Sequence, residues 1–353
     1  MTLTAFHAEQ SPGSHAESDK PTAPAVFADV RSEFAALVSG CGLFDLSTRA
    51  RIAVAGADRV RWLNGMISNK VRDLAAGRGV YAFVLNPQGH ILGDLYAYNR
   101  GDSFLLETEQ SQLEKLLNLF RRYIIMDKVE LADISDELVA LGITGGKSRS
   151  IMAAAGFELP ELQPLEVRAL SWQETKATLV RGDGEQQESY QVWLAPEGAA
   201  KLWNTLRQNG ATPVGTAALE LYRIALGVPR YGVDIHERDL PQETGQMRAL
   251  NFNKGCYIGQ EIVERIRSRG NVHRKFTGFL VEGPLPAPET KVRAEGSDKD
   301  AGEITSSASL PVAGGEQPVA LGYIRHEAAV PGKNLQAGEA NVAVTETPFA
   351  GVW

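Results

Sequence analysis

Hydrophobic positions follow a helical period in some parts of the chain and a strand period in others, up to about residue 275. Apolar residues three and four apart predict helices that begin near residues 27, 58, 111, 199 and 217. Alternating or continuous apolar runs predict strands at about 51–55, 79–85, 90–98, 103–108, 128–133 and 138–144. Asn86-Pro87-Gln88-Gly89 has the residues of a tight turn, so the three strands from 79 to 108 are expected to form a β-meander.

The pattern changes at both ends. Beyond Phe276 the helical spacing disappears, and short alternating runs lie between clusters of Pro, Gly and Ser, which predicts a small all-β domain over 276–353. Residues 1–26 are polar and rich in Pro, Gly and Ser, so we expect a disordered tail there. The sequence therefore predicts an α+β region over 27–275, preceded by a tail and followed by a β domain.

The charge and the cysteine and histidine content of the chain exclude or disfavour several classes of function. The chain has 353 residues and a net charge of −7, which disfavours a protein that binds nucleic acid over its whole surface. Cys41 and Cys256 are its two cysteines and no CxxC occurs, so a disulfide framework and a cysteine-rich metal module are excluded. No histidine pair has metal-ligand spacing, and we expect no stable metal site. The absence of a targeting signal and of a membrane-length apolar run predicts a cytoplasmic protein.

One segment combines a potentially reactive cysteine with glycines: Lys254-Gly-Cys-Tyr-Ile-Gly-Gln-Glu261. The glycines at 255 and 259 allow close approach of another backbone segment. Helical patterning begins at Glu261, which puts Cys256 near the start of a helix and two residues from Lys254. A helix N-terminus and a nearby cation both favour a thiolate over a thiol. A lone cysteine can also be a small buried hydrophobe, and the residues alone leave both interpretations open.

A basic run follows this segment. Within 264–275 only Glu264 opposes five cations, which are Arg265, Arg267, Arg269, Arg274 and Lys275. On an acidic protein such a patch is suited to weak contact with a polyanion. The alternative interpretation is a solvated helix face.

The segment 254–261 matches the KGC-[YF]-x-GQE signature of the YgfZ folate-binding proteins, which resemble the glycine-cleavage T-protein, an aminomethyltransferase. Gly255, Tyr257, Gly259, Gln260 and Glu261 complete this motif around Lys254 and Cys256. Other segments resemble the same families, among them Gly42-Leu-Phe-Asp-Leu-Ser47, Arg223-Ile-Ala-Leu-Gly227, Tyr231-Gly-Val-Asp-Ile235, Pro241-Gln-Glu-Thr244 and Leu321-Gly-Tyr-Ile324.

The resemblance implies a fold and a ligand. It implies ferredoxin-like α+β lobes in a ring around a central folate channel, with a C-terminal antiparallel β-barrel. Position by position, it implies folate contacts from Arg49, Asp94, Glu188 and Arg223, and a one-residue gap would replace Glu188 with Gln187. Carboxylates suit the pteridine edge of tetrahydrofolate or a one-carbon derivative, and cations suit its glutamate tail.

One departure from the T-protein bears on the reaction. The T-protein hairpin carries two consecutive aspartates, the first of which is its catalytic acid, whereas this chain has Gly93-Asp94. Neighbouring strand residues face opposite sides, so Asp94 is not expected to replace the missing carboxylate. This argues against classical aminomethyl transfer while leaving a folate pocket intact.

The resemblance thus implies a tetrahydrofolate-binding accessory protein for iron–sulfur cluster assembly or repair, with an indirect effect on tRNA modification and with Cys256 as its reactive thiol. Its expected partners are cluster assembly proteins or cluster-dependent enzymes. No contact with a membrane is expected. Two alternatives remain: a folate-dependent aminomethyl or one-carbon transferase, and an RNA-binding module that uses the basic run 264–275.

Overall fold

The structure, a computed structural model, describes residues 23–349 except 47, 185–187, 271 and 295–298. The predicted tail therefore lies almost entirely outside the described residues. The chain folds into two compact units. The first consists of the chain up to Leu63, Lys70–Tyr81 and Leu95–Leu219, and the second of Asn64–Asn69, Ala82–Asp94 and Glu220–Trp353.

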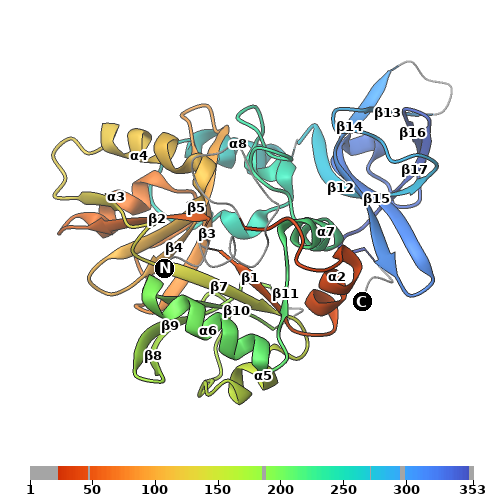
Figure 1. Cartoon of the computed structure of the whole chain (residues 1–353). Coiled ribbons are helices and arrows are strands. Elements are labelled where there is room, and N and C mark those ends of the chain that lie inside the picture. Colours follow the sequence, from red (N-terminus) through yellow and green to blue (C-terminus); the bar gives the residue numbers. More distant parts are fainter. Residues whose placement is uncertain (1–22, 47, 185–187, 271, 295–298, 350–353) are drawn as a thin grey trace. The chain divides into compact units, whose positions relative to one another are not determined.

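The first unit is built on a six-stranded sheet with the order β11-β1-β7-β10-β9-β8. Its strands are β1 (Gly42–Asp45), β7 (Val139–Thr144), β8 (Val167–Trp172), β9 (Thr175–Arg181), β10 (Ser189–Leu194) and β11 (Thr212–Pro213). The helices α5 (Ser148–Ala154) and α6 (Pro196–Gln208) lie along this sheet (Figure 1). Leu141 and Ile143 of β7 share a core with Leu202, Trp203 and other apolar residues of α6, so these helices cover one face.

The opposite face of that sheet packs on a second sheet, of order β3-β4-β5-β2-β6. Its strands are β2 (Arg49–Ala55), β3 (Arg78–Leu85), β4 (Ile91–Asn99), β5 (Phe104–Glu109) and β6 (Glu130–Asp133). Tyr98 of β4 meets Trp193 of β10 edge to face, with ring centroids 5.1 Å apart, and Ala140 of β7 belongs to the same cluster. Alternation along β7 thus supplies both cores.

The remaining α-helices before the barrel region are α2 (Val30–Val38), α3 (Arg59–Met66), α4 (Leu113–Arg122), preceded by the short η1 (Gln110–Gln112), and α7 (Thr216–Leu226). The boundary between the two units falls within α3 and within α7. Trp62 of α3 packs edge to face on Phe120 of α4, with centroids 5.6 Å apart. The periodicity predicted all four α-helices to within a few residues. The predicted meander is also confirmed, because β3, β4 and β5 are neighbours in the sheet.

The second unit contains a closed six-stranded barrel of order β12-β15-β14-β13-β16-β17. Its strands are β12 (Arg274–Glu282), β13 (Lys291–Arg293), β14 (Asp300–Val312), β15 (Gly315–Arg325), β16 (Asn334–Ala337) and β17 (Ala340–Thr345), with η4 (His326–Ala328) after β15. Every strand pair that closes it is antiparallel, and Phe279, Val292 and Ile304 are fully buried inside. The predicted α+β class with a C-terminal antiparallel barrel is confirmed.

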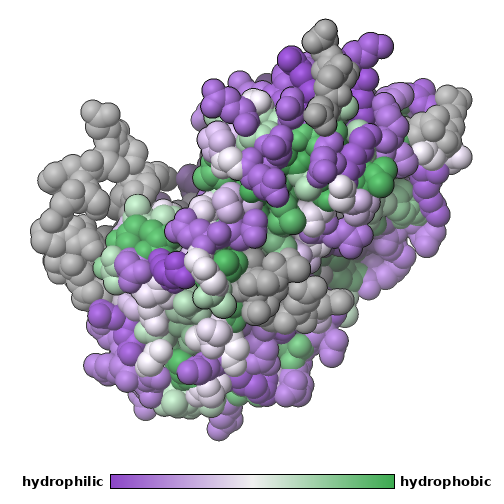
Figure 2. Space-filling model, turned by 90° about the vertical axis from the view of Figure 1, so that its right-hand side faces the viewer, coloured by the Kyte–Doolittle hydropathy of each residue, from purple (hydrophilic) through white to green (hydrophobic). Residues whose placement is uncertain are grey.

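Between α7 and the barrel the second unit has η2 (Pro241–Thr244), η3 (Met247–Ala249) and α8 (Gln260–Arg269). These elements lie with the tip of the β3–β4 hairpin and with segment 64–69 in one unit. The face of the molecule drawn in Figure 2 is mainly hydrophilic, with hydrophobic residues in scattered groups. The signature segment 254–261 therefore belongs to the second unit, and its surroundings there can be described in detail.

Candidate functional site

The signature segment forms a loop that is fixed to segment 64–69 by backbone hydrogen bonds. Asn251 donates its amide to the carbonyl of Ser68 at 3.2 Å, and Ile258 donates to the carbonyl of Gly65 at 3.2 Å. Ser68 continues the connection, since its hydroxyl donates to the carbonyl of Ala249 and accepts from the amide of Phe83. The loop 251–259 is thus held at both ends by backbone that lies far from it in the sequence.

Gly259 is required where the loop enters α8. It is the N-cap residue with φ of +85°, and a Cβ there would lie 2.7 Å from the carbonyl oxygen of Asn86. Gly89, on the same hairpin turn, has φ of +79° and would bring a Cβ within 2.8 Å of Ile262. The close approach expected of the motif glycines is therefore confirmed at Gly259. At Gly255 it is not, because a Cβ there would meet nothing within 4 Å among the described residues.

Cys256 is exposed at the surface of this loop. It precedes the N-cap of α8 by three residues, so it lies in the loop rather than in the first turn of the helix. The field of a helix end weakens within its first turn, which reduces the helix contribution that the sequence suggested. The exposure also argues against the interpretation of Cys256 as a small buried hydrophobe.

Lys254 is buried, and its side chain binds backbone carbonyls of segment 64–69. Its Nζ donates to the carbonyl oxygens of Ile67 at 2.5 Å and Asn69 at 2.7 Å, and lies 4.6 Å from the ring centroid of Tyr257. Burial lowers the pKa of Lys254 to about 7, an effect that the two carbonyls and the ring oppose. The Nζ group therefore anchors the loop to segment 64–69. Its expected action on the thiol stays a prediction.

Tyr257 is the second buried residue of the motif. Burial raises the pKa of its phenol to about 12, and its hydroxyl has no hydrogen-bond partner within the part of the chain that the structure describes. Gln260 and Glu261, by contrast, begin α8 and are partly or fully exposed. The motif thus places the exposed thiol of Cys256 between two buried side chains, those of Lys254 and Tyr257.

Replacement of Lys254 by Met should test the anchoring role. The two carbonyls lose their donor, so we expect a loss of unfolding free energy of about 1–3 kcal/mol at pH 7. The pKa of Lys254 is lower in the folded chain than in the unfolded chain, so the wild type gains stability as pH rises from about 7 towards 10.5 and the Met variant does not. The deficit of the variant in urea unfolding should therefore grow between pH 7 and pH 9.

The same variant separates anchoring from thiol activation. If Lys254 acts only as an anchor, iodoacetamide should alkylate Cys256 at the same rate in both proteins at pH 7. A rate about tenfold lower in Lys254→Met would show that Lys254 activates the thiol.

Arg223, an expected folate contact, has every N–H donor engaged within the second unit. Its Nε and one Nη form a fork with Glu220 at 3.0 and 2.7 Å, and the other Nη donates to Asp234 and to the carbonyl of Val228, both at 2.6 Å. The fifth donor reaches the hydroxyl of Ser306 at 2.9 Å. This geometry favours a structural role, because no N–H is left for a ligand.

Asp234 is the reason for that arrangement. Its carboxylate is fully buried and also accepts from the hydroxyls of Thr305 and Ser306 at 2.5 and 2.7 Å. A buried charge of this kind must be paired, and Arg223 supplies the cation. Arg223 and Asp234 therefore connect the end of α7 to strand β14 of the barrel.

The other expected folate contacts differ in availability. Arg49 on β2 forms ion pairs with Glu107 at 2.6 Å and Glu109 at 2.5 Å. Glu188, just before β10, is 41% exposed and accepts a hydrogen bond from Tyr190 at 3.3 Å. Gln187, the alternative to Glu188, lies outside the described residues. Arg49 and Glu188 belong to the first unit, whereas Arg223 and Asp94 belong to the second.

Gly93 and Asp94 occupy opposite faces of strand β4, as the strand period requires. Gly93 is buried, Asp94 is partly exposed, and the alternation continues to Leu95. The carboxylate of Asp94 therefore does not lie on the face where a residue at position 93 would point.

The basic run is less available to a polyanion than its sequence suggests. The guanidinium of Arg274 binds Asp239 and Glu243 and lies 4.5 Å from the ring centroid of Tyr323. Arg267 stacks on Phe252 at 4.4 Å. Arg265 and Lys275 are exposed, and the side chain of Arg269 is not described. The expectation of five available cations is wrong for Arg274, because its charge is neutralised inside the unit.

Sequence reasoning missed the acidic partners Asp234, Asp239 and Glu243. Asp234 and Glu243 lie inside two segments quoted for the family resemblance, but a carboxylate in a motif does not reveal which cation it binds. Asp239 also accepts the amide of His236, and Glu243 that of Leu240, so the acid pair is tied to its own backbone as well. Charged residues that are buried in pairs join segments whose separation in the sequence hides the contact.

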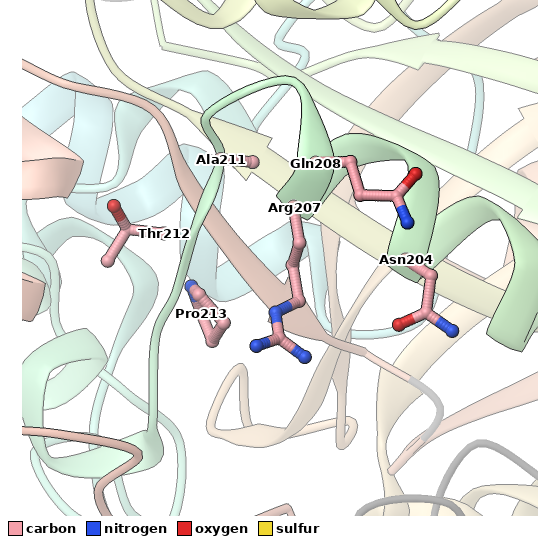
Figure 3. Close-up of a pocket in the computed structure, with 6 residues that line it drawn as sticks. All are labelled: Asn204, Arg207, Gln208, Ala211, Thr212 and Pro213. Atoms are coloured by element: carbon pink, nitrogen blue, oxygen red, sulfur yellow. The ribbon is translucent and has the colours of Figure 1, made fainter.

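A surface pocket of about 470 Å³ lies elsewhere, at the end of α6 in the first unit (Figure 3). It is lined by Asn204, Arg207, Gln208, Ala211, Thr212 and Pro213, and Figure 3 shows the polar side chains of the first three extending from the last turns of α6. None of the expected site residues lines it. Among the described residues, no group of three or more His, Cys, Asp or Glu is placed to hold a metal ion, and no helix has the length and hydrophobicity of a membrane span.

Comparison with known proteins gives relatives over most of the chain. An aminomethyltransferase of Rubrobacter xylanophilus is 30% identical over 306 residues, which cover 86% of this chain and 81% of the relative. A putative chloroplastic transferase of Arabidopsis thaliana is 27% identical, covering 88% of this chain and 72% of its own. The crystal structure of glycine cleavage system aminomethyltransferase T from Bartonella henselae has the same fold, with a TM-score of 0.85, 20% identity, and coverage of 99% and 98% of the two chains.

Two family models divide the chain between them. The model of the GCVT N-terminal domain matches residues 5–254, and that of the CAF17 C-terminal β-barrel domain matches residues 269–350. The first match covers more than half of the chain and the second coincides with the closed barrel. The chain is therefore a member of the GCVT domain family that carries a CAF17-type C-terminal barrel.

Proposed function

We propose that this protein binds tetrahydrofolate or a one-carbon derivative in the cytoplasm and acts as an accessory protein in iron–sulfur cluster assembly or repair, with Cys256 as its reactive thiol. Its effect on tRNA modification is indirect, through cluster-dependent enzymes. The observation that carries the role of the thiol is the exposure of Cys256 between two buried motif residues, Lys254 and Tyr257. Folate binding is supported by membership of the GCVT domain family.

The candidate folate contacts fit such a ligand only in part. Asp94 and Glu188 carry partly exposed carboxylates, which suit the N–H donors of a pteridine edge. Arg49 and Arg223 are already paired with carboxylates, so neither is expected to bind the glutamate tail. We therefore keep each acid as a separate candidate for pteridine recognition, Glu188 in the first unit and Asp94 in the second, and leave the two arginines their structural roles.

Cys256 suits transient rather than stable ligation. A single thiolate can accept a cluster fragment, a sulfur species or a one-carbon adduct, but a stable cluster takes several thiolates. Lys254 and Gly259 then act on the thiol indirectly, because they fix the loop that presents it. The test is the activity of a cluster-dependent tRNA-modifying enzyme in cells that lack this protein: wild type should restore it, and failure to do so would contradict the proposal.

A folate-dependent aminomethyltransferase is the second candidate, because relatives with 25–30% identity carry that name. Against it stands Gly93, where the T-protein has its catalytic acid. General acid–base help contributes about 10²–10⁴ in rate and needs a group within hydrogen-bond reach of the reacting atom. Asp94 faces the other side of β4 and does not supply it.

Replacement of Gly93 by Asp tests this second candidate. We expect no folate-dependent release of an aminomethyl group by the wild-type protein, and a detectable rate for Gly93→Asp if only the carboxylate is missing. The measurement is turnover with tetrahydrofolate and an aminomethyl donor, alongside circular dichroism because position 93 is buried. Wild-type turnover at rates typical of enzymes, about 1 s⁻¹ or more, would favour the transferase instead.

RNA binding through the basic run loses support. Arg274 and Arg267, two of the five cations in that run, are engaged by acidic or aromatic neighbours in the second unit. Any remaining contact with a polyanion would depend on the exposed Arg265 and Lys275. Its affinity would fall steeply as the salt concentration rises.

A further inference from the structure

Residues 121–128, which comprise the last two residues of α4 and most of the loop that leads to β6, expose large apolar side chains to solvent. Ile125 is 83% exposed and Met126 is 93% exposed, the highest values among the large hydrophobic residues described as exposed. Tyr123, next to them, is 37% exposed. The loop follows α4 in the first unit (Figure 1) and contains none of the expected site residues. We call residues 121–128 the α4–β6 tip.

Hydrogen bonds fix both ends of the α4–β6 tip, so Ile125 and Met126 are exposed on an ordered segment. The indole of Trp62 donates to the carbonyl of Tyr123 at 3.2 Å. The amide of Lys128 donates to the carboxylate of Asp58 at 2.8 Å, and the amide of Asp58 donates to the carbonyl of Lys128 at 3.2 Å. These bonds hold both ends of the tip on helix α3 and its N-terminal turn. A presented segment that is already ordered loses less entropy on binding.

The charge around these apolar residues is positive. Arg121, Arg122 and Lys128 are exposed, and Asp127, the one carboxylate in the tip, is bound by Arg61. The chain as a whole has a net charge of −7, whereas the α4–β6 tip carries a local positive charge beside its exposed apolar residues.

We infer that the α4–β6 tip docks into an apolar cleft rimmed by carboxylates on a partner protein. Ile125 and Met126 would enter the cleft, where the flexible thioether of methionine adapts to the wall, and Arg121 and Arg122 would meet the acidic rim. A cleft matches two adjacent side chains on a narrow loop. A bilayer does not, because stable membrane attachment takes a long amphipathic face or two separate anchors.

The experiment begins with a photo-crosslinking amino acid at position 126 of the full chain, expressed in cells of the organism that encodes the protein. The control carries the same amino acid in place of Leu285, which is also exposed. The protein captured at 126 alone is purified and titrated against the unlabelled full chain by fluorescence anisotropy. Capture only identifies the probe, and the titrations decide the question.

Two variants and one control are compared in those titrations. Ile125→Ser/Met126→Ser should weaken binding by about 10- to 100-fold, as expected for central apolar anchors. Arg121→Ala/Arg122→Ala should slow association and flatten its dependence on salt. Leu285→Ser/Val330→Ser removes two exposed apolar residues elsewhere and should leave the dissociation constant unchanged. Thermal melts should match for all variants, since every altered residue is exposed.

Three results would overturn the inference. One is capture at position 126 that does not exceed capture at 285, and another is a dissociation constant that the Ile125/Met126 variant does not change. The third is co-sedimentation of the wild type, but not of that variant, with vesicles of phosphatidylcholine and phosphatidylserine, because the tip would then be a membrane anchor. None of these depends on folate or on Cys256, so the inference fails or holds separately from the proposed function.

Discussion

Replacement of Cys256 by Ser is expected to abolish activity while changing the free energy of unfolding by no more than about 0.5 kcal/mol. The thiol is exposed, so its loss removes little packing, and surface substitutions rarely exceed that amount. A serine hydroxyl does not ionise near neutral pH and does not act as a soft ligand, so it cannot replace a thiolate. The measurements are urea unfolding and the cellular activity of a cluster-dependent tRNA-modifying enzyme.

Cys41 provides the matched control, with the opposite outcome expected. It is 1% exposed in the core of the first unit, and burial raises the pKa of its thiol to about 11, which keeps it unreactive. A hydroxyl in that core should cost about 1–3 kcal/mol of stability, yet Cys41→Ser should retain activity. Full activity of Cys256→Ser, or a loss of stability as large as that of Cys41→Ser, would contradict the reactive-thiol role.

Replacement of Arg223 by Ala is expected to lower the free energy of unfolding by about 3–5 kcal/mol. The substitution leaves the fully buried carboxylate of Asp234 without its cation, and removing one partner of a buried ion pair typically costs that much. Arg230→Ala is the control, because its guanidinium is 44% exposed and contacts Glu220 at 3.1 Å, so about 1 kcal/mol or less is expected.

Urea unfolding measures both variants, and the slope of the transition should stay the same. The affinity of folded Arg223→Ala for tetrahydrofolate should be close to that of the wild type. A loss of affinity of about 10- to 150-fold with little change in stability would instead make Arg223 a folate contact.

The elements could be predicted from the sequence because their hydrophobic residues repeat at regular intervals. The helix with Leu113, Leu116, Leu117 and Phe120 on one face is α4, and the loss of helical spacing after Phe276 marks the start of the barrel. Gly259 could also be anticipated as a point of close approach, since glycine is the residue that such a contact needs. The pattern that reveals these features is local.

Contacts between distant segments could not be predicted in the same way. Lys254 is buried because the carbonyls of Ile67 and Asn69 receive its ammonium group, and nothing near Lys254 in the sequence announces them. The basic run looked available because Asp239 and Glu243, which neutralise Arg274, lie in a separate segment. A count of charges within a window treats each side chain as solvated, whereas the fold pairs some of them.

The central claim is that this chain binds a reduced folate, and isothermal titration of the purified wild-type protein with tetrahydrofolate and with 5-formyltetrahydrofolate tests it most directly. We expect saturable binding of at least one of them with a stoichiometry near one, weakened in Asp94→Asn and unchanged in Cys256→Ser. Absence of heat from both ligands, with the protein shown to be folded by circular dichroism, would contradict the claim.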